Sequence, residues 1–96
     1  MALKHYDVTL AATATPITSD VDDRKGILYV LIHNTGNNSA IYIGDSTVSA
    51  TSYGHTLASG EEVTIGPFSG AAPTATDKVY IFGTENDVVH ALVVTF

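Results

Sequence analysis

The sequence predicts an all-β fold: a single antiparallel β-sandwich, jelly-roll-like or small barrel domain of roughly six to eight strands. Val, Ile and Thr, whose branched side chains favour strands, supply 30 of the 96 residues. Apolar and polar residues alternate in short runs, which turn-forming residues separate at a spacing of about ten residues. No stretch carries the sustained apolar spacing of an amphipathic helix. A chain of this length forms one domain, 1–96, around one modest core.

The beginning of the chain predicts two extended segments. The first is a strand with Tyr6, Val8 and Leu10 on one face, and residues 1–5 ahead of it are interpreted as an N-terminal arm. The second is the Thr-rich stretch around Pro16. Because proline cannot donate a ladder hydrogen bond, this stretch is expected at the edge of a sheet.

Five further apolar runs predict the remaining strands: Ile27–His33, Ala40–Gly44, Glu61–Ile65, Lys78–Gly83 and Val88–Phe96. The run at Ile27–His33 is apolar on both faces, so it is expected to be a central strand covered on both sides. Short turns at 34–39 and 84–87 predict that the first two runs form one hairpin and the last two form another. Two long loops of small residues, 45–59 and 66–77, connect the rest.

Composition excludes several classes of function. The chain has no Cys, so it has no disulfide and no thiolate chemistry. Its net charge of −6 argues against a nucleic-acid partner. No apolar run approaches the roughly 20 residues that a membrane helix needs, and the first residues do not resemble a signal peptide. We therefore expect a protein made in a cytoplasm, with no cofactor and no membrane partner.

The Gly-Asp-Ser-Thr turn at 44–47 is the one stretch that suggests catalysis, because such a turn opens one family of lipases and esterases. Those enzymes need helices around a parallel sheet and a distant Asp and His, which this chain does not offer. The turn is instead interpreted as a strand exit, in which the Asp45 carboxylate accepts a hydrogen bond from the backbone two residues on. No enzyme activity is expected.

Two groups of residues are candidate metal ligands. His5, His33, His55 and His90 have no neighbouring histidine in the sequence, although His33 and His90 lie on predicted strands that could bring them together. Asp20, Asp22 and Asp23 form an acidic turn, but the glycine and the closing Glu of a calcium-binding loop are missing and two cationic residues follow directly. Hydrogen-bonded strand histidines and a solvated turn are the favoured interpretations, and cation binding by the acidic turn stays open.

Some tyrosines are expected in the core of the domain and one at a surface that contacts a partner. Tyr29 and Tyr80 lie on apolar strands and are expected in the core, with their hydroxyls in water. Tyr53 lies in a long loop and is the better candidate for contact with a partner.

The chain from residue 28 onward carries a pattern similar to that of a known protein family. The residues that carry it are Ala40–Gly44, the turn Asp45–Ala50, Gly54, Leu57, Gly60–Ile65, Lys78–Gly83 and the apolar closing strand. This pattern, which covers residues 28–96, resembles small β-rich virion proteins of tailed bacteriophages. Tyr53, directly before Gly54, departs from the pattern.

The resemblance implies a non-enzymatic virion structural protein: a capsid decoration (cement) subunit that binds the major capsid protein on the outer capsid surface, as a homotrimer at threefold positions. The alternatives are a tail, head-completion or fibre subunit, or a small carbohydrate-binding β-sandwich module, which the tyrosines favour and the absence of Trp does not. The expected partner contacts lie in the arm and in the two long loops: Leu3, His5, Tyr53, His55 and Phe68. The family pattern carries no catalytic residues.

Overall fold

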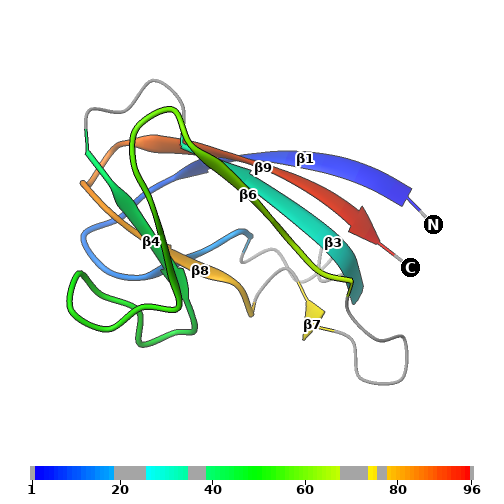
Figure 1. Ribbon diagram of the computed structural model, residues 1–96, viewed down its shortest axis with the longest axis horizontal. Helices are drawn as coiled ribbons and strands as arrows, with labels where there is room; N and C mark the ends of the chain where they lie inside the picture. The colour runs from blue at the N-terminus through cyan, green and yellow to red at the C-terminus, as the bar shows by residue number, and fades with distance from the viewer. Residues whose placement is uncertain (1, 19–25, 35–38, 68–73, 76–77, 96) are drawn as a thin grey trace.

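The computed structural model describes residues 2–18, 26–34, 39–67, 74–75 and 78–95, which form nine strands and no helix (Figure 1). The strands are β1 (Ala2–Thr9), β2 (Thr15–Pro16), β3 (Gly26–His33), β4 (Ile41–Gly44), β5 (His55–Leu57), β6 (Glu62–Ile65), β7 (Thr74–Ala75), β8 (Tyr80–Phe82) and β9 (Val88–Thr95). No helix that could cross a membrane occurs in this part of the chain.

The strands form two antiparallel sheets that pack face to face, as a small β-sandwich. The larger sheet has the order β1-β9-β3-β6, and the short β7 pairs with the beginning of β3 on the side of β6. The smaller sheet has the order β2-β8-β4-β5. Figure 1 shows the long strands of the larger sheet lying over the shorter strands of the smaller one. The predicted all-β sandwich is confirmed.

The core lies between the sheets and follows the alternation of the strands. Along β9, Val89, Ala91 and Val93 are buried while the residues between them face outward. The smaller sheet contributes Ile41, Ile43, Leu57 and Ile81 from the opposite side. The last apolar run of the sequence is therefore a core strand, as expected, and Pro16 lies in the edge strand β2, also as expected.

Both predicted hairpins are wrong, because each pair of strands divides between the two sheets. β3 is in the larger sheet and β4 in the smaller; β8 is in the smaller and β9 in the larger. At both connections between the sheets, the turn residues are held by hydrogen bonds. The Asn34 amide donates to the carbonyl oxygens of Ser39 and Leu57, and Leu10 exchanges backbone hydrogen bonds with Asn86 and Asp87. Asn34 thus bonds across the sandwich to Leu57, whereas the hydrogen bonds of Leu10 extend the pairing of β1 with β9 into the turn before β9.

Three further expectations need correction. Ala2–His5 is the first half of β1, paired with β9, and not a separate arm. The long loop 45–59 contains β5, which is too short to show a period. Tyr29 is 38% exposed and lies outside the core, because only one face of β3 is covered by the other sheet.

Candidate functional site

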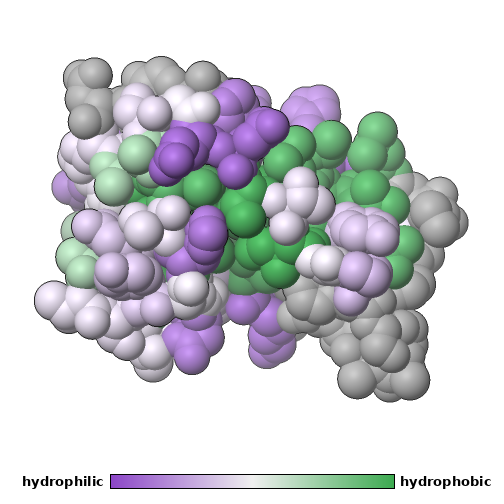
Figure 2. Space-filling view, in the orientation of Figure 1, coloured by the Kyte–Doolittle hydropathy of each residue, from purple (hydrophilic) through white to green (hydrophobic). Residues whose placement is uncertain are grey.

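The outer face of the larger sheet, which we call the open face, carries a band of apolar side chains. Leu3 of β1 lies opposite Val94 of β9, which lies opposite Tyr29 of β3. One step along the strands, Leu92 lies opposite Leu31. Leu3 is 68% exposed, Tyr29 38% and Leu92 37%, and Figure 2 shows apolar residues reaching the surface along this sheet. Large apolar side chains gathered on one face make this surface a candidate for contact with a partner.

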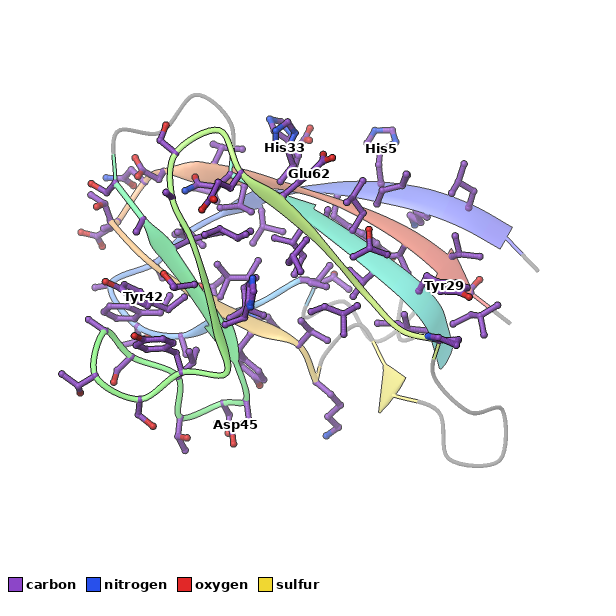
Figure 3. The ribbon with its side chains drawn as sticks, viewed as in Figure 1. His5, Tyr29, His33, Tyr42, Asp45 and Glu62 are labelled. Carbon is purple, nitrogen blue, oxygen red and sulfur yellow. The ribbon has the colours of Figure 1, made fainter. Side chains whose placement is uncertain are left out.

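A polar row crosses the same face beside the apolar band. The register places Asp7, His90, His33 and Glu62 side by side on β1, β9, β3 and β6. His90 and Asp7 share a hydrogen bond of 2.8 Å between Nδ1 and Oδ1. In Figure 3, His33, Glu62 and His5 all point away from the smaller sheet. The apolar band is thus bordered by two carboxylates and by histidines.

The second surface feature is a depression of about 280 Å³ beside Tyr53, between the end of β4 and the start of β5. Tyr53 is 49% exposed, and its ring packs against Tyr42 with centroids 4.9 Å apart. Asp45 and Thr47 line the same depression. We call it the Tyr53 depression. Tyr42 and Asp45 lie far from His5 and His33 in Figure 3, so the two surfaces are separate.

The predicted strand exit at Asp45 is confirmed. Asp45 Oδ1 accepts a hydrogen bond from the backbone N–H of Thr47 at 2.9 Å and another from the Thr47 hydroxyl. These two hydrogen bonds, the side-chain one first, hold the pKa of Asp45 below its ordinary value. Asp45 is therefore a carboxylate at neutral pH, engaged in its own turn.

The predicted contact residues divide between the two surfaces. Leu3 and His5 lie on the open face, although in a strand and not in an arm. Tyr53 lines the depression, and His55 is exposed at the start of β5. Phe68 lies outside the described residues, as do Asp20, Asp22 and Asp23. The structure therefore brings the four predicted contact residues that it describes to no common site.

Sequence reasoning missed Tyr29 and Leu92 as surface residues. Tyr29 lies in Ile27–His33, whose apolar residues on both faces predict cover on both sides. Leu92 lies in Val88–Phe96, which is predicted as a core strand. The signal was present, because an apolar outer face also occurs where a sheet binds a partner. Periodicity alone does not separate the two cases.

His33 and His90, which the sequence suggested could converge, are direct cross-strand partners. Even so, no three His, Asp or Glu side chains within the described ranges are grouped so that they could hold a metal ion.

No protein-family model matches the chain, and comparisons with curated proteins and with solved structures found no match.

Proposed function

We propose that the protein is a non-enzymatic virion structural subunit that decorates the outer surface of a capsid and stabilises the shell. The proposal joins the resemblance of residues 28–96 to phage virion proteins with one structural observation, the apolar band of the open face. Leu3, Tyr29 and Leu92 form a contiguous exposed surface on a small domain whose net charge is −6. Such a surface favours burial against a protein partner.

The open face would carry the capsid contact. Its apolar centre resembles the buried centre of a protein interface, and its border holds Asp7 and Glu62. The partner is the major capsid protein. Its contact surface is therefore expected to be apolar at its centre and basic at its edge. A subunit that binds assembled shell and not free capsid protein stabilises the shell by mass action.

On the particle, we further propose that three copies meet at threefold and quasi-threefold positions. A core this small supplies limited stability alone, and contacts between copies would add to it. A particle reconstruction that shows isolated single copies, away from any symmetry axis, would contradict the trimer. The proposed capsid contact would be unaffected by that result.

The test is to add purified protein back to particles that lack it and to measure retention after pelleting and the temperature of DNA release. Leu3→Ser should bind about 10- to 100-fold more weakly, because burying a leucine contributes roughly 1.5–3 kcal/mol. The variant should fold normally, since Leu3 is largely exposed. Tyr53→Ala removes a large exposed side chain from the other surface and separates the two candidate contacts. It should bind like the natural protein if the open face holds the capsid, and more weakly if the Tyr53 loop does.

Two results would overturn the proposal. One is normal retention of Leu3→Ser and of a second open-face variant, Leu92→Ser. The other is equal heat stability of particles with and without the protein. Equal heat stability, together with recovery of the protein in tail fractions, would favour the tail or fibre alternative.

A further inference from the structure

The Tyr53 depression combines one exposed aromatic ring with several polar groups. Its lining residues include Tyr53, Asp45, Thr47 and Ser52. Among the residues that the structure describes, no Lys or Arg lines it. An exposed ring beside oxygen donors and acceptors is a combination suited to a ligand with one apolar face and many hydroxyl groups.

The aromatic part of the site is supported from behind. Tyr42 holds the Tyr53 ring at a centroid distance of 4.9 Å, with the two rings tilted by 47°, and Phe82 lies 6.4 Å beyond Tyr42. Both supporting residues belong to the smaller sheet, on β4 and β8. Tyr53 is thus held by rigid strands although it lies in a loop, which lowers the entropy lost when a ligand stacks on it.

The polar part of the site is held in place by backbone hydrogen bonds. The amide of Val48 donates to Asp45 O at 3.0 Å, the amide of Ser49 to Ser52 O at 2.8 Å, and the amide of Gly54 to Ile43 O at 2.8 Å. Both hydrogen bonds from Thr47 end on Oδ1 of Asp45. A ligand hydroxyl can therefore donate to Oδ2 without disturbing the turn.

We propose that the Tyr53 depression binds a carbohydrate, namely a neutral hexopyranose unit. The C–H face of the sugar ring stacks on Tyr53, one hydroxyl donates to Asp45, and others exchange hydrogen bonds with Thr47 and Ser52. The Asp45 carboxylate, with no cation among the described lining residues, disfavours phosphate and acidic sugars. The polar groups disfavour a purely apolar ligand, because they would lose water without gaining a partner.

The site is small and open, so a single copy is expected to bind with a dissociation constant on the order of millimolar. Its position away from the open face leaves it accessible when the open face is occupied. Many copies on one particle would then raise the effective affinity for a polysaccharide. This last consequence rests on the proposed function; the sugar site itself does not.

The experiment is an NMR titration of the free protein, labelled with ¹⁵N, with the methyl glycosides of glucose, galactose and mannose in both anomers, each to about 50 mM, a range set by the expected affinity. At least one should give saturable shifts at the amides of Asp45, Thr47, Tyr53 and Gly54. Tyr53→Ala and Asp45→Asn should each weaken binding about tenfold or more, a loss of at least ~1.4 kcal/mol. Asn preserves the turn, since it accepts the same backbone hydrogen bond. Tyr29→Ala, on the open face, is the matched control and should bind normally.

Absence of saturable shifts with every glycoside would overturn the sugar site, as would binding that survives in both Tyr53→Ala and Asp45→Asn. The amide spectrum of each variant shows directly whether it is folded. Because the titration uses free protein and the decoration test uses particles, either proposal can fail while the other stands.

Discussion

Two glycines near the ends of β6 differ in what a side chain would meet. Gly66 has φ +135°, and a Cβ built there would lie 2.6 Å from the carbonyl oxygen of Leu28 and 2.9 Å from the Tyr29 ring. Gly60 has φ +85° with open space around it. We expect Gly60→Ala to lower the free energy of unfolding by about 1–2 kcal/mol, from backbone strain alone.

Gly66→Ala should cost about 3 kcal/mol or more, since strain and steric overlap add. Urea unfolding of the two variants measures the difference. Equal losses would show that Leu28 and Tyr29 move aside without cost.

The hydrogen bonds from Thr47 to Asp45 make one residue pair sensitive to acid. They lower the pKa of Asp45 in the folded chain, so their contribution to stability is present above the ordinary pKa of an aspartate and is lost as the pH falls through the lowered value. Thr47→Val should therefore raise the pKa of Asp45 toward its ordinary value, as read from an NMR titration of the carboxyl carbon. Thr51→Val, which removes a hydroxyl that contacts Ser49 and not Asp45, should leave that titration unchanged.

At the scale of the strand, β1 has to avoid pairing with other chains. It spans eight residues and lies at the edge of the larger sheet. Lys4 lies on the same side of β1 as Tyr6, with its ammonium 5.5 Å from the centre of that ring. A lysine placed on an edge strand discourages edge-to-edge association, because another strand would have to desolvate the charge.

We therefore expect Lys4→Val to aggregate faster at high protein concentration, as measured by light scattering, with little loss of stability. Lys4→Arg keeps the charge and serves as the control. Aggregation at the same rate in both variants would assign the protection of this edge to another feature.

The strands could be predicted from the sequence, but their partners could not. The apolar run Val88–Phe96 predicted a core strand, and Pro16 predicted an edge. The two false hairpins arose because a turn of polar residues looks the same whether it joins neighbours in one sheet or crosses to the other. Asn34, fully buried and bonded to Ser39 and Leu57, decides the first crossing. Its role depends on residues distant in sequence.

The two surfaces were predictable to different degrees. Tyr53 was expected as a contact residue because a large aromatic side chain in a loop of small residues has little core to enter. The open face was not expected, because its apolar band comes from three separate strands, and the row of Asp7, His90, His33 and Glu62 from four. Only the register assembles such rows.

For the whole molecule, the net charge of −6 should make attachment to particles depend on salt. Glu62→Gln removes one charge from the border of the open face, so retention at low salt should fall roughly two- to fivefold and vary less with added salt. Glu85→Gln makes the same change in the exposed turn before β9 and should behave like the natural protein. Equal salt dependence in all three proteins would show that charge on the open face does not guide attachment.

The strand order of the larger sheet also determines when its strands can pair during translation. β9 lies between β1 and β3, yet it follows both in the chain. On the ribosome, β1 has no partner until residue 88 and those after it have emerged, and β3 until then has only the short β6 and β7. Pairings between segments so far apart form slowly. The nascent chain therefore spends most of its translation with exposed strand edges, and such edges are prone to aggregation.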